Sequence, residues 1–291
     1  MAKQLLIYEQ VEPITISRHG NLSVKAGKDY KFAQFINSAP IIAAEFPNAS
    51  MEYPIVFTGD SDSVIPVVIL GLSEEVNLYI NDQGEWTAKY VPAFIRRYPF
   101  IFSSSDDGKT FTLCIDEEFS GCNEEGRGER LFDVDGEQTQ YLKNVLEFLK
   151  EYQAHYQRTE TFCKKLKDLD LLEPMSAQFT TSKGEKLNLT GFMAIDRDKL
   201  KKLTGDQFME LAKTDELELA YVHIQSMHNF NLMLERASGA DTYMGDIRRD
   251  NNGTGYSNKT KKKSTTKKTS NSKKTKKKSA AKKTAYSKKR K

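Results

Sequence analysis

One segment constrains the fold more than any other, because its pattern indicates a helix without help from its surroundings. Within Glu137–Leu172, apolar and aromatic side chains recur at the three- and four-residue spacing of a single helix face. They are Leu142, Val145, Leu146, Leu149, Tyr152 and Tyr156. Gly136 precedes the segment and Pro174 follows it, and both residue types commonly bound helices. The pattern predicts one long amphipathic helix, whose apolar face must pack against another layer.

Short strands are expected before that helix. Tyr53–Thr58 and Val64–Leu70 are strand-like apolar runs on either side of the turn-forming segment Gly59–Ser63. Val76–Ile80 and Thr110–Ile115 have the same character. These runs lie too close together for repeated βαβ crossovers, so we expect a mostly antiparallel arrangement.

Two segments near the N-terminus have weaker patterns. Ile14–Val24 predicts two short strands around a Gly/Asn turn. Helical spacing begins at Phe32, and Pro40 interrupts it. Either a further helical turn or a strand is expected for Ile41–Phe46.

The second half of the chain predicts a hairpin and three more helices. Gln178–Ile195 has the pattern of a hairpin that turns at Ser182–Gly184. Asp196 and Thr204 are suited to cap two short helices. Glu216–Ala237 carries an apolar stripe and predicts the second long helix.

These patterns together predict one α+β domain over residues 1–238. Its β-rich part is expected at residues 1–135. Its helical and hairpin part is expected at residues 136–238, with the two long helices packed against the sheet. Gly, Asn, Asp and Ser are frequent in residues 239–258, which are expected to form a flexible linker.

The final 33 residues, Lys259–Lys291, differ sharply in charge from the rest of the chain. They contain 16 Lys, one Arg and no acidic residue. The whole chain has 44 basic and 40 acidic side chains, so residues 1–258 keep 27 basic against 40 acidic ones, a net charge of −13. Because Lys259–Lys291 has too little apolar surface to offset chain entropy, we expect it to be disordered.

This basic segment predicts binding to polyanions. Lysine-rich segments bind phosphate backbones through counterion release, without reading base sequence. We therefore expect non-specific nucleic-acid binding, as in the histone-like basic tails that the segment resembles. The candidate contact residues are Lys261, Lys262, Lys263, Lys267, Lys268, Lys273, Lys274, Lys276, Lys277, Lys278, Lys282, Lys283, Lys288, Lys289, Arg290 and Lys291. An anionic membrane surface, a polysaccharide, or a solubility role without a partner are the alternatives.

Neither a membrane span nor a secretory signal is expected. Val64–Leu72, the longest apolar run, contains a proline and is about half the length that a span needs. Met1–Gln10 has too short an apolar run for a signal peptide. The three cysteines, Cys114, Cys122 and Cys163, lack the number and spacing of a disulfide framework or a zinc site. A cytoplasmic location is therefore expected.

Gly84–Phe102, GEWTAKYVPAFIRRYPFIF, is the most distinctive part of the chain, and we call it the central stretch. Pro92 and Pro99 are expected to enclose a single helical turn. One interpretation is an arginine clamp for a carboxylate or phosphate between aromatic walls. Its candidate ligand-binding residues are Trp86, Tyr90, Arg96, Arg97 and Tyr98. The other interpretation is a packed structural corner, in which one arginine pairs with an acidic side chain.

The central stretch and its flanks resemble the SapC family of bacterial proteins over about residues 5–236. The matching segments are Glu45–Phe46, Tyr53–Phe57, Gly71–Leu72, Asn77–Tyr79, Gly84–Trp86, Tyr90–Ala93, Ile95–Phe100, Gly191–Phe192, Leu200 and His223–Met227. The family takes its name from an S-layer protein locus, and its members are mostly of unknown molecular function. The resemblance therefore implies a family but no catalytic residue, and the basic segment lies outside it.

No motif in the sequence predicts a reaction. A nucleophile elbow, a Walker A loop and a Rossmann glycine pattern are all missing. His223 and His228 are five positions apart, whereas zinc-binding helices use a spacing of four. Acidic neighbours disfavour a reactive thiol at Cys114 and Cys122. No metal or cofactor is expected, and a non-enzymatic role is favoured.

Three functions remain open. The first is an interaction or accessory protein whose basic segment binds nucleic acid or another polyanion. The second is an enzyme or small-ligand-binding protein that uses a cleft near Trp86, Arg96 and Arg97. The third, which rests on family resemblance alone, is an accessory factor in surface-layer protein assembly or secretion.

Overall fold

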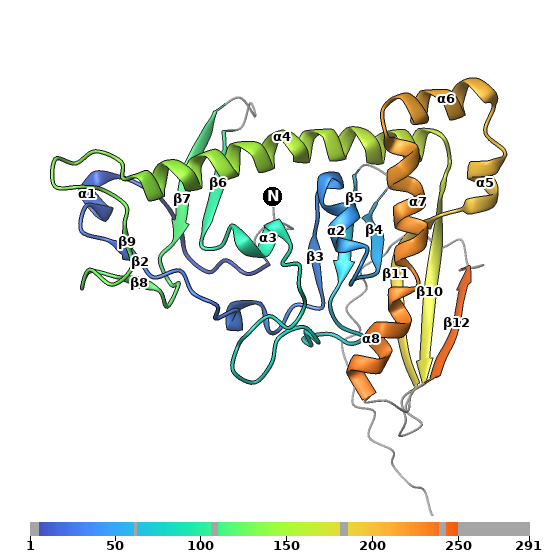
Figure 1. Ribbon diagram of the computed structural model, residues 1–291, viewed down its shortest axis with the longest axis horizontal. Helices are drawn as coiled ribbons and strands as arrows, with labels where there is room; N and C mark the ends of the chain where they lie inside the picture. The colour runs from blue at the N-terminus through green and yellow to red at the C-terminus, as the bar shows by residue number, and fades with distance from the viewer. Residues whose placement is uncertain (1–5, 61–62, 106–109, 181–185, 239–242, 250–291) are drawn as a thin grey trace, which may run out of the picture. The chain divides into compact units, whose positions relative to one another are not determined.

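The computed structural model describes residues 6–60, 63–105, 110–180, 186–238 and 243–249, which belong to one compact unit spanning Met1–Tyr256. Antiparallel sheets and helices are both prominent in this unit (Figure 1), so the predicted α+β class is confirmed. The predicted basic segment, 259–291, lies outside the described residues.

A six-stranded sheet combines strands from both halves of the sequence. Its order is β12–β10–β11–β4–β5–β3, and every neighbouring pair is antiparallel. The strands are β3 (Ser38–Pro40), β4 (Ile55–Gly59), β5 (Val64–Ile69), β10 (Leu172–Thr180), β11 (Lys186–Ile195) and β12 (Tyr243–Arg249). Met193 of β11 pairs with Phe57 of β4, so the predicted hairpin is part of the same sheet as the N-terminal strands.

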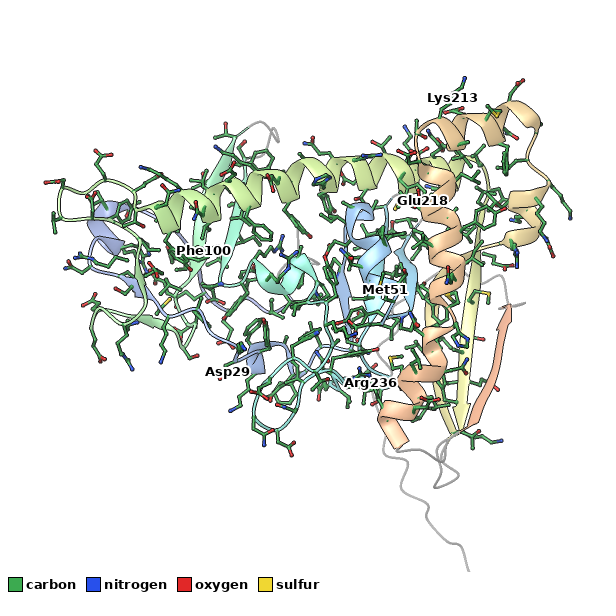
Figure 2. All side chains as sticks on the ribbon, in the orientation of Figure 1. Asp29, Met51, Phe100, Lys213, Glu218 and Arg236 are labelled. Carbon is green, nitrogen blue, oxygen red and sulfur yellow. The ribbon has the colours of Figure 1, made fainter. Side chains whose placement is uncertain are left out.

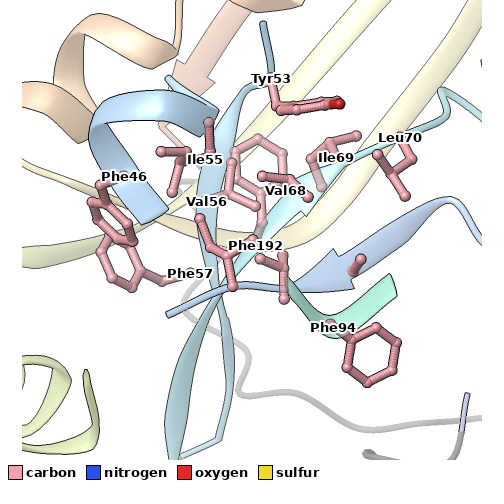
Figure 3. Close-up of a cluster of buried hydrophobic side chains, with 14 of the residues drawn as sticks. Phe46, Tyr53, Ile55, Val56, Phe57, Val68, Ile69, Leu70, Phe94 and Phe192 are labelled. Carbon is pink, nitrogen blue, oxygen red and sulfur yellow. The ribbon is translucent and has the colours of Figure 1, made fainter. Parts of the chain in front are cut away.

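β4 and β5 lie in the centre of the main hydrophobic core (Figure 3). Nearly all of their side chains are buried, because α7 contacts β4 and α4 contacts β5. Strands that are covered on both faces form continuous apolar runs rather than alternating ones, which is the pattern that the sequence shows here. Phe46 and Phe57 pack against Phe162 of α4, with ring centroids 6.1 and 6.4 Å from it.

Two three-stranded sheets lie apart from the large one in the described residues. Their orders are β1–β7–β6 and β8–β2–β9. The strands are β1 (Val11–Pro13), β2 (Ser23–Val24), β6 (Phe100–Ser104), β7 (Phe111–Asp116), β8 (Cys122–Asn123) and β9 (Glu129–Arg130). β7 confirms the strand that was predicted at Thr110–Ile115.

The predicted long helix is confirmed as α4 (Gln140–Asp168). Thr139 caps its N-terminus, because the Thr139 side chain accepts a hydrogen bond from the backbone N–H of Leu142. Along its length α4 contacts β9, β6 and β5 (Figure 1). α4 contributes buried side chains to three separate hydrophobic cores. Leu142 lies in a core near the N-terminal end of the helix, Tyr152 lies in a small core near its middle, and Phe162 lies in the main core.

The other helices are shorter. They are α1 (Ile16–His19), α2 (Phe46–Ala49), α3 (Ala93–Arg96), α5 (Arg197–Lys201), α6 (Gly205–Lys213), α7 (Glu216–Ser226) and α8 (Asn229–Ser238), with 3-10 turns η2 (Lys31–Ala33) and η3 (Ala43–Glu45). The two predicted caps are confirmed. Asp196 accepts from the backbone N–H groups of Asp198 and Lys199, and Thr204 forms a capping box with Gln207.

The predicted second long helix, Glu216–Ala237, is divided into α7 and α8. Polar side chains at the division are bound to other elements. The Ser226 hydroxyl donates to the carbonyl of His223 and accepts from the backbone N–H of Ile55 in β4. The Asn229 amide donates to the carbonyl of Tyr53. The bonds to Ile55 and Tyr53 are tertiary, and the apolar periodicity of the segment does not reveal them.

Three local expectations differ from the structure. Ile14–Val24 contains α1 and β2 rather than two strands. The helical spacing that begins at Phe32 does not produce a helix up to Pro40; η2 is followed by β3, which pairs with β5. The edge of a sheet thus overrides a short helical pattern. Val76–Ile80 is not a strand, although Ile80 forms an isolated bridge with Trp86.

The predicted linker, 239–258, also contains regular structure. Its residues Tyr243–Arg249 form β12, which pairs with β10 at the edge of the large sheet. Gly and Asp are uncommon in strands, so their presence in and around this segment led to the prediction of a linker. β12 forms because the backbone N–H and C=O groups at the edge of β10 are available for pairing. The composition of residues 239–258 gives no sign of this partner.

Candidate functional site

Buried or half-buried carboxylates hold the central stretch in place. The first is Glu52, which follows α2. Its two oxygens accept hydrogen bonds from the backbone N–H groups of Lys89 and Tyr90, at 3.0 and 2.9 Å. The peptide segment that leads into α3 is therefore fixed to the end of α2.

Glu45 holds the next part of the stretch. It is only 4% exposed, and one of its oxygens accepts from the Tyr90 hydroxyl and from the backbone N–H of Ala93, both at 2.7 Å. The other oxygen accepts from the backbone N–H of Ile42 at 2.9 Å. Burial raises the pKa of Glu45, and these hydrogen bonds act in the opposite direction. Glu45 thus joins η3 to the start of α3.

Asp116 holds the end of the stretch. This fully buried carboxylate accepts from the backbone N–H groups of Glu9 and Gln10, at 2.8 and 3.0 Å. The Tyr98 hydroxyl also donates to it, at 3.3 Å. Burial and the Asp116 charge both raise the pKa of Tyr98. Asp116 connects β7, the N-terminal segment and the residue before Pro99.

The two predicted prolines do enclose a helical turn, since α3 lies between Pro92 and Pro99. Its two arginines have different surroundings. Arg96 is exposed, donates from Nε to the carbonyl of Val91 at 3.0 Å, and lies over the rings of Tyr90 and Phe148.

Arg97 is buried, with only 6% of its surface exposed. Its guanidinium carbon lies 4.6, 5.0 and 5.7 Å from the ring centroids of Phe94, Tyr152 and Tyr8. Within the described residues, its Nε and Nη2 atoms are buried without a hydrogen-bond partner, and no carboxylate forms an ion pair with it. Its charge is stabilised by aromatic faces instead.

We expect Arg97→Met to change the free energy of unfolding by less than about 1 kcal/mol. The variant loses cation–π contacts worth about 0.5–2 kcal/mol, and it no longer buries a charge without a counterion. Urea denaturation of the wild type and the variant measures the difference. A loss above about 3 kcal/mol would contradict this account and would show that the site requires a cation.

The remaining predicted ligand-binding residues also make structural contacts. Trp86 donates from Nε1 to the Tyr53 hydroxyl at 2.8 Å, and its ring stacks on Tyr79. The Tyr53 hydroxyl in turn donates to the carbonyl of Tyr90. Trp86, Tyr90, Arg96, Arg97 and Tyr98 are close in sequence, but apart from the contact of Arg96 with the Tyr90 ring their side chains have different partners. Among the described residues, one hollow lies near α8 and one near the end of α4, and these five residues line neither of them.

The larger hollow lies beside the central stretch, on its Trp86 side. It has a volume of about 760 Å³ and lies between the end of α2 and α8 (Figure 2). Met51, Glu52, Leu232, Glu235 and Arg236 line it, and we call it the α2–α8 hollow. The sequence did not point to it, because α8 and α2 are far apart in the chain and Arg236 belongs to no motif. The second hollow, of about 230 Å³, lies between the β4–β5 turn and the end of α4.

The two buried histidines have defined partners. His19, the last residue of α1, is buried, and its Nε2 lies 3.0 Å from a Glu117 oxygen. Arg18 binds the same carboxylate with two bonds of 2.6 Å. Buried His223 accepts at Nε2 from the backbone N–H of Ile195, at 3.0 Å. Among the described residues, no group of three or more His, Cys, Asp or Glu side chains could hold a metal ion.

The cysteines are unsuited to nucleophilic chemistry. Burial raises the pKa of Cys122 to about 11 and that of Cys163 to about 12, and Asp116 contributes to the shift at Cys122. Burial also raises the pKa of Cys114. The direction is the one expected from the sequence for Cys114 and Cys122, but burial contributes more to it than the acidic neighbours do.

The fold and these contacts define an α+β domain in which hydrogen-bonded carboxylates fix an aromatic, arginine-containing corner. Residues 14–233 match the family model SapC, and the chain belongs to the SapC family. No curated protein sequence and no solved structure matches the chain. In the part of the chain that the structure describes, every helix is too short or too polar to cross a membrane.

Proposed function

We propose that this SapC-family member is an interaction protein whose basic segment, Lys259–Lys291, binds nucleic acid or another polyanion without sequence specificity. The observation that carries the proposal is the separation of charge in the sequence. The basic segment has 17 positive and no negative side chains, whereas residues 1–258 have a net charge of −13. The body should repel a polyanion, so the contact is confined to the basic segment.

The contacts of the described residues support a binding role rather than a catalytic one. Glu45 and Asp116, the buried carboxylates of the central stretch, accept hydrogen bonds from backbone N–H groups of neighbouring segments. Such bonds occupy the lone pairs that a general base would use. The three thiols have raised pKa values. We therefore assign these carboxylates and thiols a structural role.

Binding to a short DNA duplex, followed by fluorescence anisotropy over a salt series, tests the proposal. We expect the full chain to bind with a log–log salt slope of about −0.9 for each phosphate neutralised. A chain that ends at Asn258 should bind at least about tenfold more weakly at low salt. A full-length variant with Gln at every Lys of the segment should behave like the truncated chain.

A scrambled segment of the same composition is the matched control, and it should bind as the native segment does, because counterion release does not depend on residue order. Heparin and vesicles that contain anionic lipid, used as competitors, separate nucleic acid from the alternative polyanions. Equal DNA binding by the full-length and truncated chains would refute the proposal.

A further inference from the structure

The α2–α8 hollow is lined by charged side chains and by two exposed apolar ones. Met51 and Leu232 are 72% and 40% exposed, although both are large apolar residues. Figure 2 labels Met51, which follows α2, and Arg236 of α8. A volume of about 760 Å³ lies in the range of small-molecule sites.

Arg236 presents a guanidinium group that is held in place from one side. Its carbon lies 4.6 Å from the centroid of the Tyr79 ring, and its Nη1 donates to the Thr87 hydroxyl at 3.1 Å. Within the described residues it forms no ion pair. Its other N–H donors are therefore available for a carboxylate, whose planar geometry matches the guanidinium.

Negative charge lies in the same hollow. Glu235 makes no hydrogen bond and no ion pair with any residue that the structure describes. Glu52 is fixed in place by its bonds to the backbone N–H groups of Lys89 and Tyr90. A simple anion would be repelled by these two carboxylates, and a simple cation by Arg236. A ligand with both charges would satisfy both kinds of group.

We propose that the α2–α8 hollow binds a small zwitterion with an apolar side chain, such as an apolar α-amino acid or a short peptide. The ligand carboxylate binds Arg236, and its ammonium group binds Glu235. The apolar side chain covers Met51 and Leu232, which removes their exposed surface from water. All residues assigned to this site lie outside the basic segment in the sequence.

The structure places a reporter next to the site. Trp86 is the only Trp in the chain, and its ring stacks on Tyr79, the residue on which Arg236 lies. Ligand binding at Arg236 should change the environment of this pair. Trp86 fluorescence therefore measures occupancy in the full-length protein without a label.

The test is a titration of the full chain with L-leucine, leucyl-leucine, N-acetyl-leucine and leucinamide, followed by Trp86 fluorescence and calorimetry. We expect saturable binding of leucine, of leucyl-leucine or of both. N-acetyl-leucine and leucinamide each lack one charge, so both should bind at least about tenfold more weakly, because each loses a charge-assisted bond.

Two variants examine the assigned groups. Arg236→Gln and Glu235→Gln should each weaken binding at least about tenfold, with circular dichroism spectra like that of the wild type. Arg96→Gln is the matched control: it removes an exposed arginine of the central stretch that does not line the hollow, and it should bind as the wild type does.

Absence of saturable binding by both leucine and leucyl-leucine would overturn the assignment. Binding that is insensitive to Arg236→Gln would overturn it too. Loss of binding in Arg96→Gln alone would instead place the ligand at the predicted arginine site. DNA affinity should be unchanged in Arg236→Gln, so this proposal and the proposed polyanion binding can fail separately.

Discussion

Replacing Glu45 with alanine is expected to lower the free energy of unfolding by about 3–5 kcal/mol, measured by urea denaturation at neutral pH. The carboxylate accepts hydrogen bonds from Ile42, Tyr90 and Ala93. Alanine leaves two backbone N–H groups in a buried site without an acceptor, and each costs about 1–3 kcal/mol. It also leaves a space where the side chain was packed.

Glu45→Gln should lower the free energy of unfolding by less, about 1–3 kcal/mol, because the carbonyl oxygen of the glutamine side chain can still accept the bonds made to one carboxylate oxygen. Glu147, an exposed residue of α4, is the matched control, and Glu147→Ala should change stability by less than about 0.5 kcal/mol. Equal, small effects at Glu45 and Glu147 would show that the bonds to Glu45 do not hold the central stretch.

The protein should lose about 2 kcal/mol of stability through His223 alone when the pH falls from 7 to 5. His223 is fully buried, and burial lowers its pKa to about 3, against about 6.5 in an unfolded chain. Between these values the unfolded state binds a proton that the folded state does not bind. The free energy of unfolding therefore falls as the pH falls, by about 1.4 kcal/mol per unit.

Comparison of the wild type with His223→Gln isolates this contribution, because other titrating groups affect both proteins alike. The Gln variant should have a shallower dependence on pH between 7 and 5, whatever its stability at pH 7. His228→Gln, at an exposed position, should retain the wild-type dependence. Identical slopes for the wild type and His223→Gln would mean that His223 is protonated in the folded protein.

Elements with a strong local pattern were predictable from the sequence. The spacing of apolar residues in α4, the continuous apolar runs of β4 and β5, and the caps Asp196 and Thr204 are all local features. β3 and the division of α7 from α8 were not predictable, because each depends on a partner elsewhere in the chain.

The same holds for the candidate sites: local features were predictable from the sequence, and contacts between distant segments were not. The sequence predicted the helical turn between Pro92 and Pro99, and the structure confirms it. It could not show that Arg97 would lie among Tyr8, Phe94 and Tyr152, since only tertiary structure brings these rings together. Nor could it find the α2–α8 hollow, where Arg236 meets residues near α2.

α4 has a consequence for how the domain loses its structure. Its 29 residues extend for about 44 Å, and three cores depend on its buried side chains. Its Thr159 hydroxyl also accepts from the backbone N–H of Ala43, two residues before Glu45. Each small sheet and the large one pack against this helix, through β6, β9 and β5. The regions around the three cores therefore form a single cooperative unit, and their slowest amide protons should exchange together through global unfolding.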